Sequence, residues 1–159
     1  MESMRIFLLA DCPEFVPVCA SCAYGQWGCQ SGGSLERSLS RFSTAGRDTL
    51  PITLVAFFDG KPAGMASLWE SDFSAKPQPS PWLASVFIHP FYRNRHVAAA
   101  LVGRAEQEAL RMGFDRCFLV TEEAEGLYSC CGWTVVEAVT TAYGPASLMT
   151  KNLRGNIGK

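Results

Sequence analysis

A strand, a turn and a long helix in the middle of the chain constrain the fold most. Residues 82–88 form a continuous apolar run, which predicts a central β-strand buried on both faces. His89-Pro90 ends this run, and a short basic turn follows. Over residues 98–112, apolar side chains recur at three- and four-residue steps, which predicts an amphipathic helix that Gly113 closes. A buried strand that leads into a long helix is typical of α/β sheets.

The rest of the chain adds strands and helices around this unit. Asp59-Gly60 has the residues that a two-residue hairpin turn requires. Asp11 before Pro13, and Ser34, are expected to begin two helices. Strands are predicted over residues 4–10, 52–58, 61–70, 116–120, 133–140 and 146–153, and shorter helices over 15–23, 34–42 and 123–131. This order predicts a mixed α/β sheet with helices on both faces.

The bulk properties describe a globular protein without a strong electric field. Its 159 residues fit one domain, 1–159, and 48% of them are hydrophobic. The formal net charge of −1 gives no attraction to nucleic acid or to an acidic membrane, so neither is expected as a partner. No apolar run approaches the ~20 residues of a membrane-spanning helix, and no secretory signal is recognisable. We therefore expect a cytoplasmic protein.

Seven cysteines raise the question of a metal site. Cys19-Ala-Ser-Cys22 has metal-ligand spacing, with Cys12 and Cys29 on either side. In one continuous helix Cys12 and Cys29 would lie ~25 Å apart, too far to share an ion. We expect thiols packed in the core and no metal, although a break at Pro17 or Gly25 would leave a structural zinc open.

The basic turn before the long helix is a candidate phosphate site. The first backbone N–H groups of a helix have no partner within it and lie at the positive end of its dipole. Arg93 and Arg95 add positive charge there. From this feature alone, a plain turn with solvated arginines is an equal alternative.

Two motifs in register resemble the Gcn5-related N-acetyltransferase (GNAT) family. Arg93 and Ala98 occupy the first and last positions of its acetyl-CoA-binding motif Arg/Gln-x-x-Gly-x-Gly/Ala, after the turn with Pro90 and Tyr92. The downstream signature Ala-x-x-Leu-Tyr-x-x-x-Gly-Phe is similar to Ala124-Glu125-Gly126-Leu127-Tyr128-Ser129-Cys130-Cys131-Gly132-Trp133. The resemblance covers roughly residues 50–153. It implies a mostly antiparallel sheet whose fourth and fifth strands splay apart, with residues 4–50 on the acceptor side and 51–153 as the acetyl-CoA-binding core.

The resemblance also implies where the cosubstrate acetyl-CoA binds. Backbone groups of Val86, Phe87 and Ile88 would pair with the pantetheine arm, and Thr121 would lie near it. The pyrophosphate would contact the N–H groups of Arg93, Asn94, Arg95, His96, Val97, Ala98 and Ala99. Two positions depart from the family pattern: His96 replaces its middle glycine, and Thr121 replaces an Asn that often closes the fifth strand.

The implied reaction is transfer of the acetyl group to a primary amine by direct attack. Tyr128 would protonate the departing thiolate, and the alternative is a core tyrosine. An amine near neutral pH must lose a proton first. Glu70 and Asp72, at the end of the third strand, are the candidate bases. Glu122, His89 or a chain of waters are the other possibilities.

The acceptor is expected to be a small molecule or a peptide. Residues 25–50 and the loop 70–80 would form its pocket, with Trp27, Trp69, Phe73 and Trp82 as walls. Acids together with aromatic residues favour a cationic acceptor. A non-catalytic acyl-CoA-binding regulatory or interaction domain is the alternative function, and a homodimer is left open.

Overall fold

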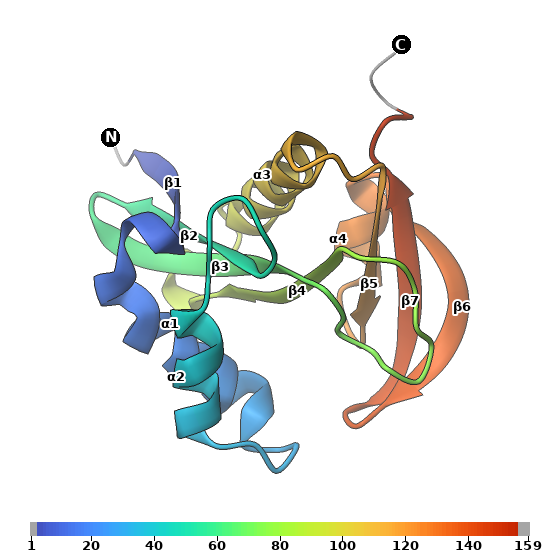
Figure 1. Cartoon of the computed structure of the whole chain (residues 1–159), viewed down its shortest axis with the longest axis horizontal. Coiled ribbons are helices and arrows are strands. Elements are labelled where there is room, and N and C mark those ends of the chain that lie inside the picture. The colour runs from blue at the N-terminus through green and yellow to red at the C-terminus, as the bar shows by residue number, and fades with distance from the viewer. Residues whose placement is uncertain (1–2, 156–159) are drawn as a thin grey trace.

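The fold is organised around one seven-stranded sheet. The computed structural model describes residues 3–155; residues 156–159, which include most of the expected polar tail, lie outside the described residues. The strand order is β1-β2-β3-β4-β5-β7-β6, and every neighbouring pair is antiparallel except β4 and β5 (Figure 1). The strands are β1 (Met4–Leu8), β2 (Ile52–Phe58), β3 (Lys61–Trp69), β4 (Trp82–Ile88), β5 (Arg116–Thr121), β6 (Thr134–Thr141) and β7 (Gly144–Asn152).

Helices cover both faces of this sheet, as predicted. The shorter pair, α1 (Val16–Ala23) and α2 (Leu35–Ser43), packs on the face that carries Val55 and Phe57 of β2. The long helix α3 (Val97–Arg111) packs on the opposite face. The face that β2 presents to α3 carries Ile52, Leu54, Ala56 and Phe58. Because successive side chains of a strand point to opposite faces, β2, which is buried along its whole length, lies between two layers of helix.

The sheet opens at the parallel junction between β4 and β5. Strands β4 and β5 pair at one position, Trp82 with Phe118, where Phe118 N–H also donates to Pro81 O at 3.1 Å. Beyond Trp82 the two strands diverge, so the second half of β4 is only half-buried. The short helix α4 (Glu125–Cys130) follows β5. The predicted fold class, with splayed fourth and fifth strands, is confirmed.

Local turn chemistry explains several element boundaries. Asp59 and Gly60 both have positive φ, 48° and 79°, which is the geometry expected for a tight hairpin turn. The Ser34 hydroxyl accepts a hydrogen bond from Arg37 N–H at 3.1 Å and caps α2. Gly113, with φ 94°, follows the end of α3. All three predictions are confirmed.

The N-terminal region departs from its predicted form. The first strand ends at Leu8 and a 3-10 turn follows, so Asp11 caps no helix and instead forms an ion pair with Arg47. A π-helical turn, Tyr24–Gly28, continues α1 past Gly25. In α2, Phe42 is buried while Leu35 is 42% exposed, because only the C-terminal half of this helix reaches the core.

The cysteines of this region do not all lie in the core. Cys19 is buried, which raises the pKa of its thiol to about 12, whereas Cys29 is exposed. The prediction of core packing is therefore wrong for Cys29, and it is also wrong for Cys130, which is exposed at the end of α4. Within residues 3–155, no group of three or more His, Cys, Asp or Glu side chains is placed to hold a metal ion. The same part of the chain has no helix long and apolar enough to cross a membrane.

Candidate active site

A cleft of about 810 Å³ opens where β4 and β5 separate. Strand β4 forms one wall, and the end of β5 with α4 forms the other. The π-helical turn, α2 and the β6–β7 turn surround its outer end. Among the predicted site residues, the cleft brings together Asp72, Val86, Thr121 and Tyr128.

The backbone of β4 presents polar groups toward the open side of the sheet. His89 N–H donates to Ala63 O at 2.8 Å, and Phe87 pairs with Met65 of β3. The N–H and C=O groups of successive residues in a strand point to alternate sides. Those of Phe87 therefore point to β3, and those of Ile88 point to the side from which β5 has diverged. Of the three predicted pantetheine contacts, the backbone of Phe87 is thus directed toward β3 and away from the open edge.

A bulge in β4 was not anticipated from the sequence. The pairing with β3 shifts register between Met65 and Ser67, opposite Ser85. Ser85 has φ 52°, a left-handed conformation that is uncommon for a non-glycine residue and is typical of bulges near functional sites. Serine inside an apolar run carries no signal for such a conformation.

The turn before α3 leaves a row of backbone donors available. The first main-chain bond at the start of α3 is Ala100 N–H to His96 O, at 3.1 Å. Within the described part of the chain, the N–H groups of Val97, Ala98 and Ala99 have no hydrogen-bond acceptor. Asn94 and His96 have φ values of 64° and 63°, so the turn is built from two left-handed residues. These donors lie at the positive end of the helix dipole.

Arginine side chains buttress this turn. Arg93 Nε donates to Ile88 O at 3.2 Å, which ties the turn to the end of β4. The guanidinium of Arg95 lies 5.5 Å from the ring centre of Phe91 and 5.6 Å from that of Tyr92. The His96 side chain is exposed and makes no capping hydrogen bond.

Tyr128 presents a hydroxyl group to the cleft from a buried ring. Tyr128 as a whole is 6% exposed, and its ring packs edge-on against Trp133 with ring centroids 6.2 Å apart. The hydroxyl forms no hydrogen bond with any other described residue. In the described part of the chain, every fully buried side-chain N or O atom has a hydrogen-bond partner, so this hydroxyl is not fully buried. The hydroxyl must therefore reach the water of the cleft. Burial, with smaller effects of Cys131 and Asp72, raises the pKa of Tyr128 above that of a free tyrosine, so it stays protonated.

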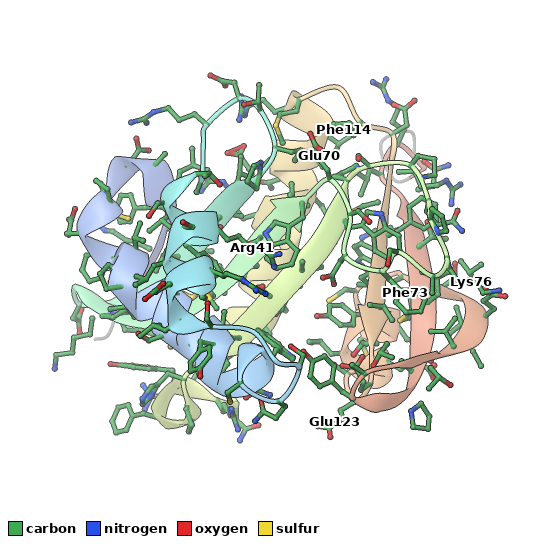
Figure 2. The ribbon with its side chains drawn as sticks, turned by 60° about the horizontal axis from the view of Figure 1, so that its bottom comes forward. Arg41, Glu70, Phe73, Lys76, Phe114 and Glu123 are labelled. Atoms are coloured by element: carbon green, nitrogen blue, oxygen red, sulfur yellow. The ribbon has the colours of Figure 1, made fainter. Side chains whose placement is uncertain are left out.

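Only one of the two predicted bases lines the cleft. Asp72 is exposed at the mouth, yet protein atoms crowd around its carboxyl group, and this desolvation raises its pKa to about 7. The charge of Arg41 lowers this pKa and that of Glu122 raises it. Glu70 does not line the cleft; in Figure 2 it lies at the opposite end of the molecule from Glu123.

The end of β5 supplies two further polar groups. Thr121 Oγ1 accepts from Ala124 N–H at 3.0 Å and closes the turn between β5 and α4. Glu122 accepts a hydrogen bond from Thr141 Oγ1 at 3.2 Å. Desolvation raises the pKa of Glu122, which the bond from Thr141 opposes.

The aromatic walls are partly as expected. Trp27, Trp69 and Phe73 line the cleft, whereas Trp82 does not. Trp82 is fully buried against Phe118, so its prediction as a wall is wrong. Tyr143, on the β6–β7 turn, was missed: its hydroxyl donates to Trp27 O at 3.0 Å and bridges the outer end of the cleft.

Two arginines of α2 were also missed. Arg37 and Arg41 are one helical turn apart and both line the cleft. Figure 2 shows Arg41 extending from α2 toward β4. Charged residues four positions apart are common on any solvent-exposed helix face, so the sequence alone does not indicate that this face borders a cleft.

Comparison with known proteins identifies the family. Residues 21–133 match the model of the acetyltransferase (GNAT) family, and the chain belongs to this family. No curated protein sequence matches it significantly. The predicted resemblance and acyltransferase class are thereby confirmed.

Solved structures share the fold at low sequence identity. A chimera of the spermidine N-acetyltransferase SpeG from Vibrio cholerae and hSSAT superposes with a TM-score of 0.74 and 14% identity, over 98% of this chain and 99% of that one. An aminoglycoside 6'-N-acetyltransferase complexed with coenzyme A gives 0.71 and 13%, over 95% and 97%. The yncA protein from Salmonella typhimurium, solved with acetyl-CoA, gives 0.67 and 18%, over 96% and 94%.

Proposed function

We propose that this protein transfers the acetyl group of acetyl-CoA to a primary amine by direct attack in a ternary complex. The observation that carries this proposal is the meeting of three features at one cleft. They are a strand edge without a partner, a protonated tyrosine hydroxyl facing water, and a carboxyl group with a pKa of about 7.

The residues present fit acetyl-CoA. The unpartnered N–H groups of Val97, Ala98 and Ala99 suit a pyrophosphate, which a helix N-terminus binds without further help. The free edge of β4 suits an amide-containing arm that lies where a neighbouring strand would pair. The contacts would be Val86 and the N–H of Ile88, since Ile88 O already accepts from Arg93 Nε. Two solved neighbours of this fold contain coenzyme A or acetyl-CoA.

In the proposed reaction, Asp72 accepts a proton from the ammonium form of the acceptor. The freed amine nitrogen attacks the thioester carbonyl carbon, so that a C–N bond forms and the C–S bond breaks. Tyr128 donates its proton to the departing thiolate sulfur and recovers one from the water that its hydroxyl contacts. The nitrogen loses a second proton, which restores the water that reprotonated Tyr128. Asp72 passes its proton to solvent, so one proton is released in total.

A pKa of about 7 suits Asp72 to its role. A general base is most effective when its pKa lies near the working pH, because it is then ionised in part and still strong enough to take a proton. Glu70, outside the cleft, is not assigned a step.

The test is a CoA-release assay with purified protein and several amine classes, together with a thermal-shift titration. We expect acetyl-CoA to raise the melting temperature. At 100 times its dissociation constant it should add about 2.7 kcal/mol to the free energy of unfolding. Pantetheine without the pyrophosphate should stabilise much less. Stabilisation without CoA release for any amine would favour the non-catalytic alternative. No stabilisation by millimolar acetyl-CoA would contradict the function.

A further inference from the structure

The cleft is lined by charges of both signs. Arg37 and Arg41 extend from α2, Asp72 lies on the loop after β3, and Glu122 and Glu123 follow β5. An amine acceptor accounts for the acids but not for the arginines. Two cations at the entrance would repel an acceptor that carries only positive charge.

Arg41 is held in a form suited to binding an anion. Its guanidinium carbon lies 4.4 Å from the centre of the Trp69 ring, at the end of β3. A guanidinium on an aromatic face keeps its N–H edge available, and that planar edge matches a carboxylate. Within residues 3–155, neither Arg37 nor Arg41 forms an ion pair.

Arg41 and Asp72 are neighbours that do not touch. The charge of Arg41 is near enough to influence Asp72, yet the two side chains form no ion pair. Opposite charges that line the same cleft without forming an ion pair leave room for a group that satisfies both. A molecule with an ammonium and a carboxylate on one carbon has that arrangement.

We infer that the acceptor is an α-amino acid, whose carboxylate binds Arg41 and whose amine faces Asp72. This inference rests on the proposed acetyl transfer and adds the class of acceptor. Arg37 adds positive charge one turn away on α2, and Trp27 and Phe73 offer apolar surface to the amino-acid side chain. The arrangement disfavours polyamines, which bring further cations and no anion.

The experiment compares each amino acid with the amine that lacks only its carboxylate: leucine with isoamylamine, and phenylalanine with phenethylamine. Spermidine serves as a polycation. We expect kcat/KM for the amino acids to exceed that for the matched amines by about tenfold or more, since a hydrogen bond to a charged group is worth roughly this factor. Leucine should also raise the melting temperature in the presence of CoA.

The Arg41→Gln variant should remove this preference. We expect KM for leucine to rise roughly tenfold to a hundredfold, with kcat/KM for isoamylamine unchanged or higher. Leucine should no longer stabilise the protein–CoA complex. Arg41→Lys, which keeps the charge but not the planar edge, should fall between the two. Arg5→Gln removes an exposed arginine that does not line the cleft and should match the wild type.

Three results would overturn the inference. The first is equal or better turnover of the matched amines or of spermidine by the wild type. The second is an Arg41→Gln variant that loses both substrates of a pair to the same extent while still binding acetyl-CoA. In both cases the acetyl transfer itself stands. The third is absence of CoA release with every acceptor, which overturns the proposed function as well.

Discussion

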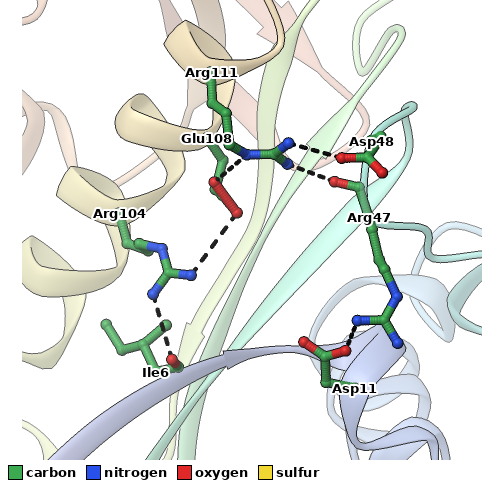
Figure 3. A network of polar contacts seen from close by, with 7 residues as sticks. All are labelled: Ile6, Asp11, Arg47, Asp48, Arg104, Glu108 and Arg111. Carbon is green, nitrogen blue, oxygen red and sulfur yellow. Dashed lines mark hydrogen bonds and ion pairs between the residues drawn. The ribbon is translucent and has the colours of Figure 1, made fainter.

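Arg111 Nε donates to Glu108 Oε2 at 2.9 Å, one turn away on α3. This pair is the centre of a network that links the helix to the N-terminal half of the chain (Figure 3). The same guanidinium contacts Asp48 Oδ1 at 2.7 Å and Arg47 O at 2.6 Å. Arg104 contacts Glu108 at 3.8 Å and Ile6 O at 3.4 Å. Glu108 is 6% exposed, so its carboxylate is the buried centre of the network.

Glu108→Ala should therefore destabilise the protein by about 1.5–3 kcal/mol, the range for a hydrogen bond to a charged group. The loss should remain in this range because both arginine partners can turn to solvent. Asp48→Ala removes an exposed partner of the same Arg111 and should cost no more than about 1 kcal/mol. Urea unfolding of the three proteins measures both values. Equal losses in the two variants would contradict the distinction between buried and exposed partners.

The left-handed conformation of His96 leads to a second prediction. A side chain at φ 63° costs roughly 1–2 kcal/mol, which glycine avoids. We expect His96→Gly to be more stable than His96→Ala by about 1 kcal/mol. At exposed Gln107, inside α3, the order should reverse, because glycine in a helix costs about 1 kcal/mol relative to alanine.

His96→Gly should also bind acetyl-CoA a few-fold more tightly. Removal of the side chain lets the pyrophosphate approach the backbone donors of the turn more closely. Calorimetric titration of acetyl-CoA into both proteins gives the two dissociation constants. Weaker binding to the variant would mean that the imidazole donates a hydrogen bond to the phosphate.

The sequence predicted those elements that local chemistry determines. The Asp59-Gly60 turn, the Ser34 cap and the end of α3 at Gly113 each follow from a few neighbouring residues. The splayed strands and the site motif came from the family resemblance, not from periodicity.

Long-range packing determines the features that could not be predicted. The bulge at Ser85 depends on the pairing of β4 with β3, and the place of Arg41 depends on how α2 packs over the sheet. Asp72 and Glu70 are two residues apart, and only the path of the loop after β3 decides which one lines the cleft. No local pattern distinguishes them.

The pH dependence of Asp72 gives a further prediction. As the base, it must be ionised, so kcat/KM should fall below pH 7 by up to tenfold per pH unit, after allowance for the acceptor's own titration. Asp72→Asn should lose this dependence at acidic pH, and its rate should be lower than that of the wild type by a factor of about 10²–10⁴. Glu70→Gln, outside the cleft, is the matched control and should retain the wild-type profile. An unchanged profile in Asp72→Asn would show that another group or a water takes the proton.

The same pKa makes a prediction about stability. Between pH 3.8 and about 7, the folded protein holds a proton on Asp72 that the unfolded chain has lost. This group therefore lowers the free energy of unfolding as pH rises through that window, and its effect is constant above it. Asp72→Asn should raise the melting temperature more at pH 8 than at pH 5, by a small amount because the side chain contacts solvent. An equal shift at both pH values would contradict the raised pKa.

Tyr128 bears most directly on the mechanism. Its hydroxyl reaches cleft water, so Tyr128→Phe removes a donor without leaving a buried group unsatisfied. The ring keeps its packing against Trp133. We therefore expect the variant to fold with nearly wild-type stability and to bind acetyl-CoA with nearly wild-type affinity.

Turnover of Tyr128→Phe should fall mainly in the chemical step. General acid catalysis contributes about 10²–10⁴, and a thiol with a reference pKa of ~8.5 is already a good leaving group, so we expect about 10². Single-turnover kinetics would isolate this step from product release. Tyr24→Phe removes a second hydroxyl from the same cleft and should leave turnover close to that of the wild type. If the rate of the chemical step is unchanged in Tyr128→Phe, water is the acid and the tyrosine is structural. If stability and cofactor affinity fall together, the hydroxyl is a packing partner, and its assignment as the acid is wrong.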